Sequence, residues 1–149
     1  MAVYYAMITG PATGLVRGGL VRYRLSSADL RQLSLGLRRL CQLLLAAGAV
    51  ELFPSVSGLP PLCSADDLSR IPAELPAERT SLTSVHLFCS CPMGENRALC
   101  ASDSYGQVHG APDLYIQDAS LLCTAPGVNP QGSIMALARR NTLRYLESR

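Results

Sequence analysis

The stretch SSADLRQLSLGLRRLCQLLLAAG, residues 26–48, decides the fold of the first half of the chain. Ser26 and Ser27 are residue types that favour a helix N-cap, and Asp29 follows in the first turn, where a negative charge suits the exposed amides. Apolar side chains then recur at helical spacing until Gly48, at Leu30, Leu33, Leu37, Leu40, Cys41 and Leu44. The stretch predicts an amphipathic helix whose leucine stripe faces a core.

Two strands are predicted ahead of this helix. Residues 3–9 are rich in β-branched and aromatic side chains, and a run containing Gly10, Pro11 and Gly14 ends them. In LVRGGLVRYRL, residues 15–25, apolar side chains then alternate with arginines. This pattern predicts a half-exposed antiparallel sheet that places the arginines on its solvent face.

Behind the helix, the chain is predicted to be mostly irregular. Residues 50–53 favour a short strand, and residues 54–80 contain five prolines, which disfavour long regular elements. We expect a connecting loop there with one short helix near residues 65–70. Two further strands are predicted over residues 84–88 and 113–117.

A second helix is predicted at the end of the chain. It begins at Asn129, which suits the N-cap, with Pro130 in the first helical position. Its inward face is formed by Ile134, Leu137, Ala138 and Tyr145, and its outward face by Arg139, Arg140 and Arg144.

Composition narrows the class of protein. The 149 residues are 48% hydrophobic with a net charge of +2, enough for one globular domain. The basic residues are all arginines and are scattered, which argues against a nucleic-acid partner. The first ten residues lack a basic leader and a cleavage site, and the longest apolar run, residues 43–50, is far shorter than the roughly 20 residues of a membrane helix. We therefore expect a cytoplasmic protein without a membrane span, whose six cysteines are free thiols and mostly buried.

The densest group of reactive side chains lies in VHLFCSCPMG, residues 85–94. Histidine and cysteine are zinc ligands, but His86, Cys89 and Cys91 would share one strand and lack paired Cys-x-x-Cys knuckles. A cysteine nucleophile beside a histidine is a second interpretation, although no oxyanion-hole motif accompanies it. Neither interpretation has the spacing that would make it strong.

Three segments taken in order favour another interpretation. They are His86 with SCPMG (residues 90–94), LYIQDAS (residues 114–120) and GVNPQGSIMALARR (residues 127–140). Together they resemble the C-terminal signature of the glucose-methanol-choline (GMC) oxidoreductases, over about residues 84–146. The final segment is most similar to the branch that includes cholesterol oxidases and related alcohol oxidases and dehydrogenases.

The resemblance implies an α+β fold. About residues 1–83 would form part of an antiparallel substrate-domain sheet flanked by helices. About residues 84–149 would supply the closing strand and C-terminal helix of an FAD-binding domain. The chain would then belong to an enzyme that oxidises an alcohol, hydrophobic or sterol-like, to a carbonyl compound with FAD.

The resemblance also implies roles for individual residues. His86 would be the base for the hydroxyl proton, a role that suits imidazole because it titrates near neutral pH. Asn129 would hydrogen-bond the substrate oxygen, since a carboxamide both donates and accepts. The flavin would lie against six residues: Asp118, Ala119, Asn129, Pro130, Gln131 and Gly132. No metal site is implied.

Departures from the family pattern leave alternatives open. Cys89 stands where many members have glycine, and Cys123 where many have proline. No G-x-G-x-x-G fingerprint for the nucleotide half of FAD occurs. We therefore expect the isolated chain to bind FAD weakly or not at all and to be inactive alone. A separate chain would carry the FAD-binding front, or the reading frame is truncated, or the chain is a remnant. A non-catalytic domain with structural or metal-binding cysteines and histidines is the remaining alternative.

Overall fold

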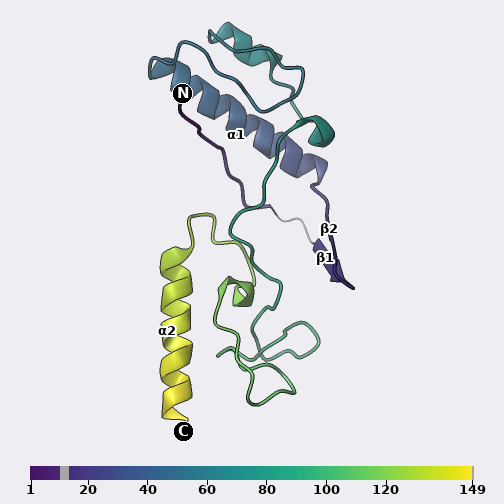
Figure 1. Cartoon of the computed structure of the whole chain (residues 1–149), viewed down its shortest axis with the longest axis vertical. Coiled ribbons are helices and arrows are strands. Elements are labelled where there is room, and N and C mark those ends of the chain that lie inside the picture. Colours follow the sequence, from purple (N-terminus) through teal and green to yellow (C-terminus); the bar gives the residue numbers. More distant parts are fainter. Residues whose placement is uncertain (11–13, 149) are drawn as a thin grey trace. The chain divides into compact units, whose positions relative to one another are not determined.

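The computed structural model describes residues 1–10 and 14–148, which divide into two compact units, Met1–Thr83 and Ser84–Arg149. The first unit holds β1 (Gly14–Arg17), β2 (Leu20–Tyr23), α1 (Ser27–Ala46) and two short 3-10 helices, η1 (Asp66–Arg70) and η2 (Ala77–Arg79). The second holds the 3-10 helix η3 (Ala119–Leu121) and α2 (Gln131–Glu147), which runs beside irregular segments of its own unit (Figure 1). The described chain is α+β-like, as the sequence predicts.

Helix α1 forms where residues 26–48 predict it. Ser26 is the N-cap, and its Oγ accepts a hydrogen bond of 3.2 Å from the Asp29 amide, while the Asp29 carboxylate accepts one of 2.8 Å from the Ser26 amide. This reciprocal capping box satisfies two amides that the first helical turn leaves without partners. Gly48, with φ of 94°, follows the last turn. Local sequence therefore determines both ends of this helix.

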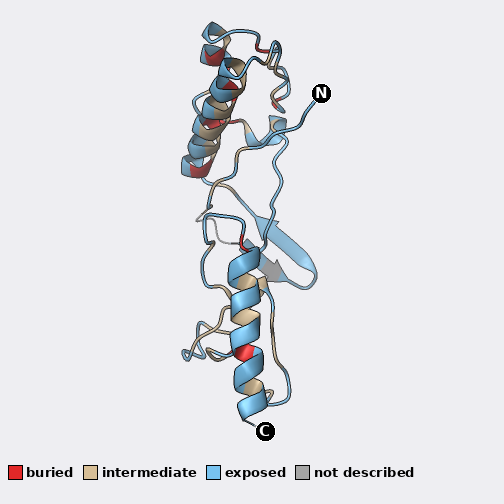
Figure 2. Cartoon of the chain, turned by 90° about the vertical axis from the view of Figure 1, so that its left-hand side faces the viewer, coloured by how far each residue is buried: buried red, intermediate tan, exposed pale blue. Residues whose placement is uncertain are grey.

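The leucine stripe of α1 faces the core of the first unit, as predicted. The proline-rich segment folds back over it, and the buried residues are Cys41, Val56, Leu62, Leu68, Ile71 and Leu75. Leu30, Leu33 and Leu37 pack against this cluster, which gives α1 its buried side in Figure 2. The Arg38 guanidinium donates to the Ile71 carbonyl at 2.7 Å, so polar contacts also hold the segment to the helix. The predicted short helix near residues 65–70 is η1.

The sheet differs from the prediction. Its two strands are β1 and β2, paired antiparallel from Gly14↔Tyr23 to Arg17↔Leu20, whereas residues 3–9 form no strand. Gly18 and Gly19 have φ of 56° and 79°, as a tight two-residue hairpin turn requires, so β2 pairs with the segment directly before it. All four residues of β2 are exposed, so the prediction of a half-exposed sheet is wrong.

Three further predicted strands are also absent. Residues 50–53 and 113–117 contribute only the isolated bridges Leu52↔Leu62 and Gln107↔Tyr115, and residues 84–88 are irregular. A strand needs a neighbour to accept its backbone hydrogen bonds, and none lies beside these segments for more than one residue pair. Among the described helices, none is both long and apolar enough to cross a membrane.

Candidate functional site

His86 lies in an irregular segment, and its side chain is exposed. Its φ is 57° and that of Cys89 is 63°, so two residues other than glycine adopt left-handed backbone conformations within four positions. Such conformations cost about 1–3 kcal/mol each and persist only where surrounding structure enforces them. They concentrate at functional sites, which makes this segment a candidate on backbone geometry as well as on motif.

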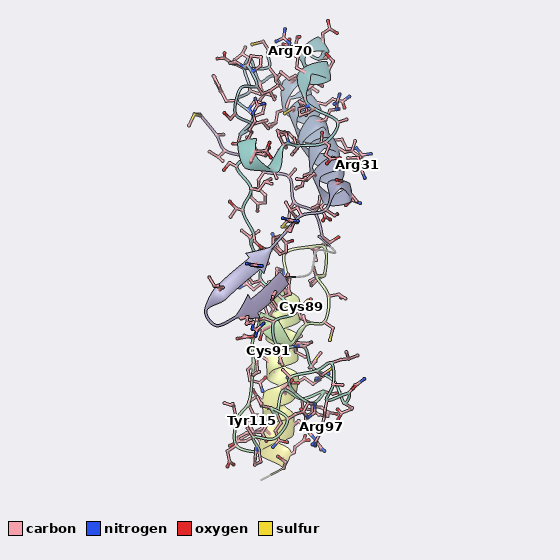
Figure 3. All side chains as sticks on the ribbon, turned by 90° about the vertical axis from the view of Figure 1, so that its right-hand side faces the viewer. Arg31, Arg70, Cys89, Cys91, Arg97 and Tyr115 are labelled. Carbon is pink, nitrogen blue, oxygen red and sulfur yellow. The ribbon has the colours of Figure 1, made fainter. Side chains whose placement is uncertain are left out.

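The first two signature segments are hydrogen-bonded to each other. The Cys91 amide donates to the Ser120 carbonyl at 3.1 Å, and the Met93 amide donates to the Leu121 carbonyl at 3.0 Å. The Cys123 thiol reaches the Met93 carbonyl at 3.3 Å, and Leu121 is fully buried beneath this contact. Segments about thirty residues apart in the chain thus form one scaffold, and Figure 3 shows Cys89 and Cys91 on the first of them.

A loop that contains the second histidine supports this scaffold. The Gly94 amide donates to the Ser102 carbonyl at 2.9 Å, and Ser102 is fully buried. Nε2 of His109 lies 2.9 Å from the Gly94 carbonyl oxygen. A carbonyl can only accept, so Nε2 carries the proton and donates it. His109 therefore holds the loop in place.

Asp118 caps η3. Its Oδ1 accepts from the amide of Ser120 at 2.8 Å and from the hydroxyl of Ser120 at 2.5 Å. These two hydrogen bonds, the one from the hydroxyl first, lower the pKa of the Asp118 carboxyl group below its usual value. Ala119, the next residue, is half-buried. The predicted flavin-contacting pair thus lies in a well-defined turn, directly beside the backbone contacts of Cys91 and Met93.

The start of α2 departs from the prediction by one residue. Pro130, not Asn129, is the N-cap, and its carbonyl accepts the first helical bond from the Ile134 amide at 2.9 Å. Because the first helical hydrogen bond goes to the Pro130 carbonyl, Asn129 lies one position before the cap. No side chain caps this helix. The Asn129 side chain is exposed, which leaves its carboxamide available for another partner.

The inner face of α2 contains the residues expected there, and its contacts hold the site together. The Tyr145 and Tyr115 rings meet edge to face with centroids 5.0 Å apart, and Tyr115 is labelled in Figure 3. Asn141, 1% exposed, accepts from the Arg140 guanidinium through Oδ1 at 2.8 and 3.0 Å. Sequence reasoning missed Asn141, because a single polar residue on a helix gives no signal of burial.

The structure brings some predicted residues together and leaves others unlinked. Backbone bonds join the Cys91–Gly94 region to the Asp118–Cys123 region, and α2 packs on the loop that leads into Asp118. Among the described residues, no hydrogen bond joins His86 to Asn129, and neither side chain has a partner within the chain. Their convergence on one substrate remains a prediction.

The cysteines are free thiols, as predicted, but only Cys41 is buried. Burial raises the pKa of the Cys41 thiol. The pKa of the Cys89 thiol is also raised, mainly by partial loss of solvent around it and to a smaller extent by the nearby Cys123 thiolate. Cys63, Cys89 and Cys123 are exposed because they lie in irregular segments outside the apolar core. Within the described residues, no group of three or more His, Cys, Asp or Glu side chains could hold a metal ion.

Comparison of the sequence with known proteins assigns the chain to a protein family. The C-terminal sequence profile of the GMC oxidoreductases matches residues 20–138. The chain therefore belongs to the GMC oxidoreductase family. The match extends well into the first unit, beyond the region about residues 84–146 in which the motifs alone carry the resemblance.

Similar proteins from three organisms agree with this assignment. An uncharacterized GMC-type oxidoreductase of Sinorhizobium fredii is 42% identical over 92% of this chain. One from Mycobacterium tuberculosis is 32% identical over 93%, and a long-chain-alcohol oxidase of Arabidopsis thaliana is 33% identical over 90%. The chain covers 28%, 23% and 19% of these relatives' lengths, about a quarter. No solved structure shows significant similarity.

Proposed function

We propose that this chain is the C-terminal catalytic part of an FAD-dependent oxidoreductase that converts the CH–OH group of an alcohol into a carbonyl group. Membership of the GMC oxidoreductase family over residues 20–138 is the observation that carries this proposal. When bound, FAD would supply the acceptor for the hydride that leaves the alcohol carbon.

The start of α2 fits a flavin. The amides of Gln131 and Gly132 belong to the first turn, where they have no acceptor inside the helix. The N-cap provides no side-chain acceptor either, and a Cβ on Gly132 would meet no atom within 4 Å, so the space beside these donors is open. Free amides at a helix N-terminus stabilise negative charge. Pro130, Gln131 and Gly132 would therefore hold the edge of the flavin ring that becomes negative on reduction.

Asp118 and Ala119 suit the polyol part of the cofactor. Both hydrogen bonds from Ser120 reach Oδ1 of Asp118, so Oδ2 keeps its capacity to accept from a ribityl hydroxyl. A lowered pKa keeps this carboxylate ionised and acceptor-only at neutral pH. Ala119, with its small side chain, would let the cofactor approach the η3 backbone closely.

His86 and Asn129 handle the substrate oxygen in this proposal. His86 takes the hydroxyl proton through a free imidazole nitrogen, and Asn129 donates an amide hydrogen to the same oxygen as the carbonyl forms. Both side chains are exposed, so no internal hydrogen bond has to break before they engage a substrate. The left-handed backbone at His86 and Cys89 supports this role, because it fixes the direction in which the imidazole leaves the chain.

A long-chain alcohol is the substrate class that we propose. The Arabidopsis thaliana relative is a long-chain-alcohol oxidase and matches 90% of this chain, which narrows the hydrophobic or sterol alcohol predicted from the sequence.

A chimera tests the proposal. This chain would replace the matching segment of the Arabidopsis thaliana long-chain-alcohol oxidase, and flavin absorbance and turnover of dodecanol would be measured. His86→Ala should lower kcat by about a hundredfold or more, the scale of general-base catalysis, without loss of flavin. His109→Gln is the matched control, because glutamine can still donate to the Gly94 carbonyl, and it should retain turnover.

Two results would count against the proposal. Equal turnover of His86→Ala and the unmodified chimera would remove His86 from the mechanism. A chimera that folds but retains no flavin would favour a non-catalytic remnant. Flavin titration of the isolated chain should show weak binding, and tight stoichiometric binding there would refute the expectation that the FAD-binding front is required.

A further inference from the structure

Arginine side chains of α2 gather around one aromatic ring. The guanidinium carbon of Arg140 lies 5.0 Å from the centroid of the Tyr105 ring, and that of Arg144 lies 5.5 Å from it. The electron-rich ring face attracts both cations, but this attraction also brings two like charges together. Arg139 adds a third exposed guanidinium in the same region.

Among the described residues, none of these arginines forms an ion pair. The ion pairs there are Arg31–Glu74 and Arg70–Asp67, both in the first unit, so none of the α2 arginines has an acidic partner. Together with Tyr105 they line a surface cavity of about 480 Å³, whose sole acidic residue is Glu147. The cavity therefore carries a net positive charge, and like charges held this close repel each other unless an anion neutralises them.

We propose that this cavity binds a ligand that carries two or more phosphate groups. Guanidinium groups present paired N–H donors that match phosphate oxygens in a bidentate geometry, and two of them suit a polyvalent anion better than a single carboxylate. The roles are divided: Arg140 donates to the carbonyl of Ser104 and to Asn141, so it shapes the site, whereas Arg139 and Arg144 bind the ligand.

None of these arginines takes part in the alcohol oxidation proposed above, so the two proposals fail independently. Isothermal titration calorimetry of the full chain with inorganic pyrophosphate tests the second one directly. We expect one saturable site whose affinity falls as potassium chloride rises. Arg139→Gln and Arg144→Gln should each weaken binding by roughly tenfold or more, the scale of a charge-assisted hydrogen bond.

Two variants make the experiment specific. Glu147→Gln removes the acid that lines the cavity and should tighten binding. Arg97→Gln, which lowers the net charge equally but lies at a different cavity, should leave the affinity unchanged. Circular dichroism would verify folding. Arg139→Gln is the less disruptive of the two variants, because the Arg139 side chain makes no hydrogen bond or ion pair among the described residues.

A second measurement distinguishes a soluble phosphate ligand from a lipid headgroup. Vesicles of phosphatidylcholine with and without phosphatidylinositol 4,5-bisphosphate would be sedimented with the chain. Pyrophosphate binding without sedimentation identifies a soluble ligand, and sedimentation that depends on phosphatidylinositol 4,5-bisphosphate and on Arg144 identifies a lipid headgroup as the source. No binding in either assay, or an equal loss in Arg97→Gln and Arg144→Gln, would overturn the proposal.

Discussion

Gly106 and Gly110, in the loop that packs against α2, have similar backbone conformations but different surroundings. Both have left-handed backbones, with φ of 86° and 83°, so alanine at either position adopts an unfavourable conformation. Their surroundings differ. A Cβ on Gly106 would lie 2.4 Å from the Ile116 carbonyl oxygen, whereas a Cβ on Gly110 would meet no atom within 4 Å. The pair therefore separates the effect of conformation from the effect of a clash.

The expected magnitudes follow from these contacts. Gly110→Ala should lower the free energy of unfolding by about 1 kcal/mol, the cost of a left-handed alanine. Gly106→Ala incurs the same cost and must also displace backbone. That displacement strains the packing by about 1–3 kcal/mol. It also weakens the Ile116 amide to Gly106 carbonyl bond of 2.9 Å, which contributes about 0.5–1.5 kcal/mol. We expect Gly106→Ala to be less stable than Gly110→Ala by about 2–4 kcal/mol.

Urea unfolding of the two variants measures this difference. The chain has no tryptophan, but near-ultraviolet circular dichroism of its tyrosines should report on the second unit, where the Tyr115 and Tyr145 rings touch. Far-ultraviolet circular dichroism reports on both helices. Variants that unfold within about 0.5 kcal/mol of each other, the usual limit for independent surface changes, would show that the close approach of Gly106 to Ile116 does not exist.

Two further predictions concern caps. Ser26→Ala should destabilise the first unit by about 1 kcal/mol because it removes the capping-box acceptor for the Asp29 amide, and the neighbouring Ser27→Ala should change urea unfolding much less. Folding lowers the Asp118 pKa, so its stabilising effect is complete above the unfolded value near 3.9 and is lost as pH falls through the lower folded value. Below about pH 4, the urea midpoint of Asp118→Asn should therefore depend less on pH than the midpoint of the unmodified chain. Identical pH profiles would contradict the role of Ser120 as hydrogen-bond donor to Asp118.

The helices were predictable because their signals are local. The Ser26–Asp29 pair and the leucine stripe specify α1 whatever the rest of the chain does, and the Ile134 to Tyr145 periodicity specifies α2. The prediction at Asn129 was wrong by one residue, because the amide of Ile134 donates the first helical hydrogen bond to the Pro130 carbonyl. The strand predictions over residues 3–9 and 84–88 were wrong, because a strand-favouring composition does not supply a pairing partner.

The candidate site also has features that the sequence predicts and features that it does not. The ordered motifs at residues 86–94, 114–120 and 127–140 indicated the family, which the comparison with the family's sequence profile confirms over residues 20–138. The contacts between those motifs were not predictable, since Cys91 meets Ser120 through backbone atoms that every residue possesses. Arg140 likewise reads as a solvated charge in the sequence, yet it bridges Ser104, Asn141 and Tyr105.

By itself, the sequence determined the two helices, the free state of the cysteines and membership of the GMC oxidoreductases, because caps, periodicity and ordered motifs act over short distances along the chain. Tertiary structure decided which thiols are buried and how the signature segments join. Those outcomes depend on hydrogen bonds and packing between residues distant in sequence, and each partner becomes defined only when the other is in place.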